Sequence, residues 1–379
     1  QLRLGALPPD DNWGVSAAQL LLEAADSCGA SDLHLLPQRD GALARVRRDD
    51  ELMHLAQIPA ARRELLTARL KVLARLPAFV KTEPQDGRIE WRLPGAQSVR
   101  TLRISFLPTL HGEHVVVRFP ENSGNALGLE ELGLSPSAML AMNGLLEAHE
   151  GVVLVTGPAG SGKTTTLYAL LSTLRDRDGA RRNFLTIEDP IERDLGFAAQ
   201  VPVHDAQGMT WERALRAAMR QDPDVLMVGE IRDVETARLT VQAGTSGHLV
   251  LSTLHAGRAA RVFTRLLSMG VDAYLAASAL QGAVAQRLVR LTCRECAGSG
   301  CAACGESGYH GRRGIFEVCR VTEPLRELML ARALPAVIAM EAARFSATTL
   351  ETELRELVET GAITNAEARF ALGGEGDVS

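Results

Sequence analysis

The sequence has 379 residues, which is too long for one ordinary domain, so two or three domains are expected. Its hydrophobic content of 46% and charged content of 23% are typical of a globular protein with enough apolar material for a core. A net charge of −5 and only 4% aromatic residues count against a nucleic-acid groove, which needs basic residues and stacking rings. No apolar run approaches the roughly 18 residues of a membrane span, and no signal-peptide pattern opens the sequence.

The first third of the chain predicts an α+β domain over residues 1–120. Turn signals at Pro94-Gly95 and His111-Gly112 separate its last strands. Residues 121–137 are rich in Gly, Ser and Asn and predict a linker. The expected helices of this domain are 15–27 and 60–75, and its expected strands are 43–48, 88–93, 99–107 and 114–119.

From residue 138 the pattern changes to alternating strands and helices. Such alternation builds a parallel sheet that helices cover on both faces, and ligands bind at the carboxyl ends of its strands. Further helices are expected at 258–269, from Asp272 to about Arg290, and through the tail, 322–373. The alternating strands are 152–156, 184–187, 225–229 and 248–253, with helices at 164–175, 211–220 and 234–243.

A phosphate-binding loop follows the first of these strands. Gly157, four residues and then Gly162-Lys163-Thr164 match G-x-x-x-x-G-K-[ST]. Because a helix begins at the end of the loop, its backbone N–H groups favour an anion there, and Lys163 adds a positive charge. The predicted ATP-binding residues are Gly157, Pro158, Ala159, Gly160, Ser161, Gly162, Lys163, Thr164 and Thr165.

Acidic residues follow two other strands of the same sheet. Glu188 ends the segment FLTIE and Glu230 follows VLMVG, so both are expected at the tips of buried strands beside the phosphate loop. Acidic groups in that position need a cation or a water molecule to stabilise them. Asp233 is expected to act as a helix N-cap, and His248, taken alone, is equally compatible with a core histidine.

Four of the six cysteines crowd into a short segment with the spacing C-x₂-C-x₄-C-x₂-C. Each C-x₂-C pair can direct two thiolates at one ion, which predicts structural zinc at Cys293, Cys296, Cys301 and Cys304. Gly298 and Gly300 permit the reversal between the pairs. Two alternatives compete with this prediction: four reduced thiols without metal, and one C-x-x-C-x-G-x-G repeat of the chaperone type, whose pairs normally bind metal with partner cysteines further along the chain that are missing here.

Five segments in this order resemble the secretion ATPase superfamily, which powers type II secretion and type IV pilus assembly. They are GPAGSGKTTTLYA, TIEDPIE, DPDVLMVGEIRD, TSGHLVLSTLHA and AQRLVRLTC. The first four correspond to its Walker A loop, Asp box, Walker B box and His box. ASDLHLLP, PQDGR, LRIS and LPTLHGEHVVVR are similar to segments of its N-terminal domain. The cysteine pairs point to the secretion and pilus-extension branches, although only four residues separate the two pairs here.

The resemblance implies a PAS-like N-terminal domain, a RecA-like core over 138–291, a zinc segment over 292–318 and a helical region over 319–379. It implies a hexameric, Mg²⁺-dependent ATPase that is peripheral on the cytoplasmic side of the inner membrane. Platform and docking proteins of the secretion or pilus machine would bind it to that membrane. The activity would drive assembly of a type II secretion pseudopilus, with type IV pilus assembly as the alternative. No nucleic-acid partner is expected.

The resemblance also implies roles for individual residues. Lys163 would hold the phosphates, and Thr164 and Glu230 would hold Mg²⁺. Glu188 would orient the attacking water, with Glu230 as the alternative. The arginines of the N-terminal domain that would reach the γ-phosphate are Arg88 and Arg103, and the histidines that would sense the γ-phosphate or the subunit boundary are His248 and His255.

Two other classes of function compete with this interpretation. A nucleic-acid translocase on the same fold is disfavoured by the acidic charge balance. A nucleotide-gated scaffold without hydrolysis is disfavoured because Lys163, Thr164, Glu188 and Glu230 are all present.

Overall fold

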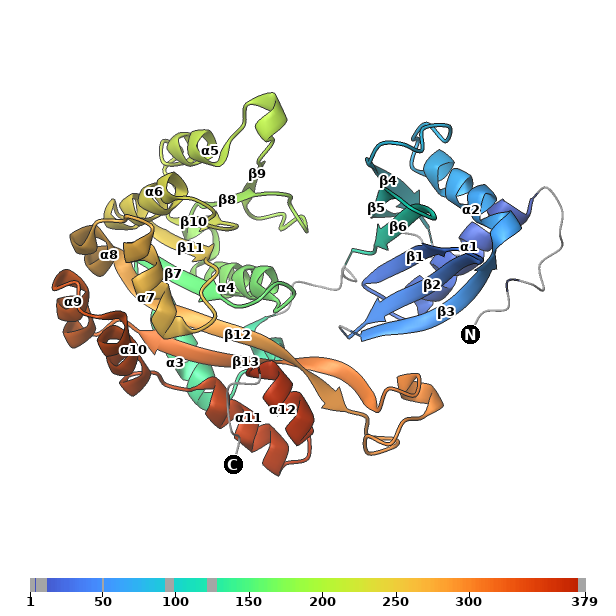
Figure 1. The fold of residues 1–379 in the computed structure, drawn as a ribbon. Helices are drawn as coiled ribbons and strands as arrows, with labels where there is room; N and C mark the ends of the chain where they lie inside the picture. Colours follow the sequence, from blue (N-terminus) through green and yellow to red (C-terminus); the bar gives the residue numbers. More distant parts are fainter. Residues whose placement is uncertain (1–3, 5–11, 50, 93–98, 121–127, 374–379) are drawn as a thin grey trace. The chain divides into compact units, whose positions relative to one another are not determined.

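A computed structural model describes residues 4, 12–49, 51–92, 99–120 and 128–373. The chain divides into two compact units, residues 1–123 and residues 124–379 (Figure 1). The predicted Pro94-Gly95 turn, the first part of the predicted linker (121–127) and the end of the tail (374–379) lie outside the described residues. Among the described residues, no helix is both long and apolar enough to cross a membrane.

The first unit is a six-stranded antiparallel sheet with two helices packed on one face. The strand order is β3-β2-β1-β6-β5-β4. Inward side chains alternate along the strands, as Leu33 and Leu35 do on β1, and pack against helix residues such as Leu22 and Leu66. Its elements are α1 (Trp13–Ser27), β1 (Asp32–Gln38), β2 (Gly41–Arg48), β3 (Glu51–Pro59), α2 (Ala60–Leu73), β4 (Gln85–Trp91), β5 (Arg100–Thr109) and β6 (Gly112–Arg118).

The second unit is a seven-stranded sheet in the order β13-β12-β7-β11-β10-β8-β9. All neighbouring strands are parallel except β12 and β13, which are antiparallel. Its strands are β7 (Gly151–Thr156), β8 (Phe184–Glu188), β9 (Ala199–Pro202), β10 (Val225–Val228), β11 (Leu249–Thr253), β12 (Leu280–Thr292) and β13 (Tyr309–Arg320).

Helices cover both faces of this sheet, as the alternation of strands and helices predicts (Figure 1). Val153 and Val155 of β7 pack towards α3 and α4, whereas Val152 and Leu154 pack in the core that α5 to α10 share. The helices are α3 (Pro136–Leu146), α4 (Lys163–Asp178), α5 (Trp211–Ala218), α6 (Val234–Thr245), α7 (Ala259–Ser268), α8 (Ala273–Ala279), α9 (Glu323–Leu330), α10 (Pro335–Arg344), α11 (Leu350–Glu359) and α12 (Asn365–Ala371). Short 3₁₀ turns are η2 (Leu129–Leu132), η3 (Gly179–Arg181), η4 (Asp205–Gln207) and η5 (Ala302–Cys304).

The predicted helix from Asp272 to about Arg290 is wrong. The alanine-rich stretch is helical only to Ala279, and β12 begins at Leu280. The segment pairs with β7 on one side and β13 on the other, and this pairing overrides local helix propensity. Gly282 fits the strand because a Cβ there would lie 2.5 Å from the Leu145 side chain.

The second part of the predicted linker is also ordered. Leu129 and Leu132 of η2 are buried in the core that α3 and α4 share, and α3 begins at Pro136 with Ser135 as its N-cap. Their apolar side chains outweigh the Gly and Ser composition that suggests a linker there.

Candidate nucleotide site and metal centre

The phosphate loop joins the carboxyl end of β7 to α4, as its sequence context predicts. Gly162 precedes the helix with φ 84°, a left-handed conformation that favours glycine. A Cβ on Gly157 would lie 2.4 Å from the carbonyl oxygen of Gln286, so glycine lets β12 approach the loop. Ser161 is buried in the loop and its hydroxyl has no hydrogen-bond partner in the described structure. The loop therefore holds an unsatisfied polar group where a ligand would sit.

Lys163 lies over the loop. Its ammonium donates hydrogen bonds to the carbonyl oxygens of Gly157 at 3.0 Å and Pro158 at 2.8 Å. Burial lowers the pKa of Lys163, Glu230 opposes this effect and Arg287 adds to it. The side chain of Thr164 is exposed on the first turn of α4, whereas Thr166 is buried and donates to Gln286 at 2.7 Å. The loop thus presents one cation and one exposed hydroxyl side by side.

The acidic residues gather at the same edge of the sheet. Glu230 accepts a hydrogen bond from Arg232 Nε at 2.7 Å, and its other carboxylate oxygen lies 3.8 Å from His255 Nε2. Arg232 also contacts Asp189 at 3.2 Å, so one guanidinium bridges the residues that follow β8 and β10. The Asp233 side chain accepts from the N–H of Thr236, which confirms the predicted N-cap of α6.

Glu188, the last residue of β8, is only 2% exposed. Its carboxylate accepts from the hydroxyl of Tyr168, from Thr186 Oγ1 at 2.5 Å and from Gln200 Nε2 at 2.9 Å. A carboxylate has about four acceptor sites, so these three donors leave about one for another partner. Burial and the carboxylate together raise the pKa of Tyr168 well above its ordinary value, so this phenol stays a donor.

The two predicted histidines lie at opposite ends of the central strand β11. His255 follows β11 and reaches Glu230, as given above. His248 precedes β11, and its carbonyl oxygen accepts from the N–H of Gly151 at the start of β7. The five residues of β11 separate these ends by roughly 17 Å. The structure therefore does not bring His248 to the phosphate loop of its own chain.

Arg88 and Arg103 lie side by side on the first unit. They are direct partners across the antiparallel pair β4 and β5, and neighbouring residues Ile89 and Leu102 point to the core on the other face. Both arginines are therefore on the face of the sheet that α1 and α2 do not cover.

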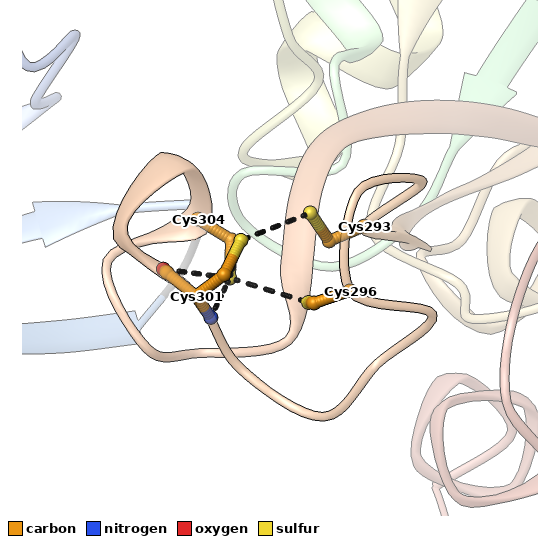
Figure 2. A group of neighbouring side chains, drawn as sticks. All are labelled: Cys293, Cys296, Cys301 and Cys304. Carbon is orange, nitrogen blue, oxygen red and sulfur yellow. Dashed lines mark hydrogen bonds between the residues drawn. The ribbon is translucent and has the colours of Figure 1, made fainter.

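The four cysteines converge in the segment between β12 and β13 (Figure 2). Their sulfur atoms all lie within 4.8 Å of one another, with the pairs Cys293–Cys301 at 3.9 Å, Cys296–Cys304 at 3.8 Å and Cys301–Cys304 at 3.7 Å. Four thiolates about 2.3 Å from one zinc ion form a tetrahedron with edges of about 3.8 Å, so the donor set fits zinc.

The backbone around Cys304 favours its thiolate form, whereas at Cys301 the backbone hydrogen bond from Cys304 is outweighed by burial and the neighbouring sulfur atoms, which raise its pKa to about 11. Burial opposes ionisation of Cys304, but the N–H groups of Cys301 and Gly308 point at its sulfur, each 3.2 Å away, and the pKa falls to about 6. Gly298 and Gly300 have φ values of 89° and 92°, which confirms the predicted reversal between the pairs. Cys319 is fully buried away from this cluster and Cys28 is in the first unit, as expected for residues that are not ligands.

The family model for the Type II/IV secretion system protein matches residues 14–369. The chain belongs to this family. The type II secretion system protein HxcR of Pseudomonas aeruginosa is 44% identical over 82% of the chain. The type II secretion system ATPase E of Vibrio cholerae is 40% identical over 86% of the chain. The type IV pilus assembly ATPase PilB of Myxococcus xanthus is 37% identical over 94% of the chain. The chain spans 66% to 68% of the length of these relatives.

The fold agrees with this membership in the secretion-system family. The solved structure of the Legionella pneumophila ATPase DotB superimposes with a TM-score of 0.72, covering 93% of this chain and 94% of that one. At 21% identity this likeness shows the fold alone. The predicted α/β core preceded by an α+β unit is thus confirmed.

Sequence reasoning missed three residues that shape this secretion-family site. Tyr168 and Gln286 lie within the quoted segments GPAGSGKTTTLYA and AQRLVRLTC, but no motif letter assigns them a partner. Arg232 lies two residues after Glu230, and this short separation in the sequence is the signal that could have indicated their contact. The contacts from Tyr168 to Glu188 and from Gln286 to Thr166 depend on tertiary packing, so spacing alone does not indicate them.

Proposed function

We propose that this chain is a Mg²⁺-dependent ATP hydrolase that powers assembly of a type II secretion pseudopilus. The observation that carries the proposal is the placement of Lys163 and the exposed Thr164 at the same sheet edge as Glu188 and Glu230. Members of the same family carry names that specify an ATPase of type II secretion and of pilus assembly.

The proposed reaction is transfer of the terminal phosphoryl group of ATP to water. Such a reaction depends on positioning and charge stabilisation more than on covalent work by the protein. The N–H groups of Gly157 and of residues 159–165, together with the ammonium of Lys163, hold the phosphates, and the carbonyl bonds that Lys163 now makes give way to bonds to phosphate oxygens. Thr164 and Glu230 would hold Mg²⁺, and the ion would supply positive charge that neutralises the phosphates.

Glu188 is proposed to orient the attacking water. Its three protein donors fix the carboxylate and leave about one acceptor site for a water molecule. Glu230 is the alternative because its side chain is more exposed and its charge acts on Lys163 of the loop.

Arg88 and Arg103 are proposed to stabilise charge on the γ-phosphate when the two units close on a nucleotide. Adjacent guanidiniums on one sheet face suit a phosphate group. His255 is proposed to sense the γ-phosphate, and His248 to act at a subunit boundary, since it lies at the other edge of the sheet.

The cysteine cluster is proposed to hold one structural zinc ion. Four ligands fill a tetrahedron and leave no position for a reactive water, so the ion would stabilise the segment and take no part in hydrolysis. The proposed assembly is a homo-hexamer, cytoplasmic and peripheral at the inner membrane, bound to platform and docking proteins of the secretion machine.

A genetic complementation experiment tests the system. In cells of origin, deletion of the coding region should abolish release of secreted proteins, and the Lys163→Ala variant should fail to restore it. Type IV pilus assembly is the second candidate because the pilus assembly ATPase PilB matches 94% of the chain. Loss of surface pili with normal secretion would support that candidate and contradict the first.

A further inference from the structure

A cavity of about 620 Å³ adjoins the phosphate loop. Gly157 and Pro158 are the loop residues that line it, and the other walls come from the turn after β11, from α7, from β12 and from the first residue of α10. Residues 159–165 do not line it, so the cavity is a neighbour of the phosphate cradle and not the cradle itself.

The described walls of this cavity carry three arginines and no acidic side chain. Arg261 and Arg265 are exposed and one helical turn apart on α7, so their side chains share one face. In the described part of the chain, neither forms an ion pair with a carboxylate. Two guanidiniums therefore face the same space without a counter-charge.

The third arginine is held in place by carbonyl oxygens. Arg287 Nη2 donates to Gly257 at 2.6 Å, and Nη1 donates to Gln286 at 3.0 Å. Burial lowers the pKa of Arg287, the nearby Arg258 adds to this effect, and Glu317 opposes it. Glu317 itself already pairs with Arg258, at 2.9 Å. Among the described residues, no carboxylate forms an ion pair with Arg287, so an anion in the cavity would offset the cost of this half-buried guanidinium.

Guanidinium groups bind phosphate oxygens through paired N–H donors. The cavity touches Pro158, whose carbonyl binds Lys163, and His255, which borders Glu230. We propose that this cavity is a second oxyanion site, which holds the inorganic phosphate that ATP hydrolysis releases. That the bound phosphate is a product of ATP hydrolysis rests on the proposed function, whereas phosphate binding by the cavity does not.

The probe is inorganic phosphate, titrated calorimetrically into the full chain already saturated with ADP and Mg²⁺. With ADP on the loop, the wild-type protein should bind one further phosphate. The double variant Arg261→Gln/Arg265→Gln should bind it at least about tenfold more weakly, since it loses two charge-assisted contacts. The affinity for ADP should not change, because neither arginine belongs to the loop.

The matched control is Arg238→Gln on α6, an exposed helical arginine that pairs with Glu235. It should bind phosphate like the wild type. Equal phosphate affinity of the double variant and the wild type would overturn the inference, as would failure of the ADP-saturated wild type to bind phosphate. ATP turnover is measured in parallel, and its absence in the wild type would count against the proposed function and not against the phosphate site.

Discussion

Glu188 has a buried carboxylate that reaches into two elements besides its own strand. Tyr168 comes from the helix that begins at the phosphate loop, and Gln200 comes from β9. The position of this carboxylate is therefore tied to the position of the loop helix. Glu230, in contrast, is held through Arg232 and has a side chain 27% exposed. The difference in burial argues for different roles, water orientation for Glu188 and metal binding for Glu230.

Replacing Glu188 with Gln tests the first role. The hydroxyls of Tyr168 and Thr186 can rotate to accept from the new amide, so the fold should persist. Turnover should fall by about 100-fold or more, while the affinity for ATP stays within a few-fold. Steady-state kinetics with calorimetric ATP binding checks this. Normal turnover of this variant, together with loss of turnover in Glu230→Gln, would show that Glu188 does not orient the water and would assign that role to Glu230.

Replacing Tyr168 with Phe removes one of the three donors without changing the shape of the side chain. Because a buried carboxylate then loses a partner, we expect a loss of about 1–3 kcal/mol in the free energy of unfolding. We also expect lower turnover with little change in ATP affinity. Chemical denaturation and steady-state kinetics measure these effects.

The control for this variant is Tyr274→Phe, a tyrosine that is 68% exposed on α8. It should change the free energy of unfolding by less than about 0.5 kcal/mol. Equal effects of the two tyrosine variants would mean that the contact from Tyr168 to Glu188 has no role in the site.

Among the elements of the second unit, sequence patterns predict the four adjacent strands β7, β11, β10 and β8 and miss β9, β12 and β13. The strands with apolar, β-branched runs and polar residues after them are predicted within a residue or two, since their composition and periodicity agree. β12 begins with an alanine-rich stretch and exists because β7 and β13 pair with it. The phosphate loop follows from its motif, whereas the partners of Glu188 depend on tertiary packing that local spacing does not encode.

The cysteine segment gives a further prediction. Protein purified without chelator should contain about one zinc per chain by elemental analysis. Replacing Cys293 and Cys296 with Ser should remove the metal and lower the melting temperature, while the folded fraction still binds ATP. Cys28→Ser is the control and should keep its zinc, since Cys28 lies in the first unit. Metal content near zero, with all four thiols titrating freely in folded protein, would disprove the zinc site.

The proposed mechanism of the whole molecule uses residues of both units. The second unit supplies the loop and the acidic residues, and the first supplies Arg88 and Arg103. Arginines that contact the γ-phosphate only when the units close would contribute to turnover more than to binding. Composition and the change in pattern near residue 138 predict the two-part organisation. The 3₁₀ turn η2 lies inside the predicted linker, and it forms because Leu129 and Leu132 are buried in the core.

The double variant Arg88→Ala/Arg103→Ala should therefore lower kcat by on the order of 100-fold and leave the affinity for ATP nearly unchanged. Arg75→Ala, at a side chain that is 85% exposed in the same unit, is the matched control and should behave like the wild type. Unchanged kcat in the double variant would remove both arginines from the mechanism.

The proposed function requires that Mg²⁺-dependent ATP hydrolysis takes place at the phosphate loop. The most direct test measures phosphate release from ATP by the purified protein, with Mg²⁺ and with chelator, beside the Lys163→Ala variant. Turnover should require Mg²⁺ and should be abolished in the variant, because the ammonium that neutralises the departing phosphoryl group is gone. Phosphate release by Lys163→Ala at the wild-type rate, or none from folded wild-type protein with Mg²⁺, would contradict the proposed function.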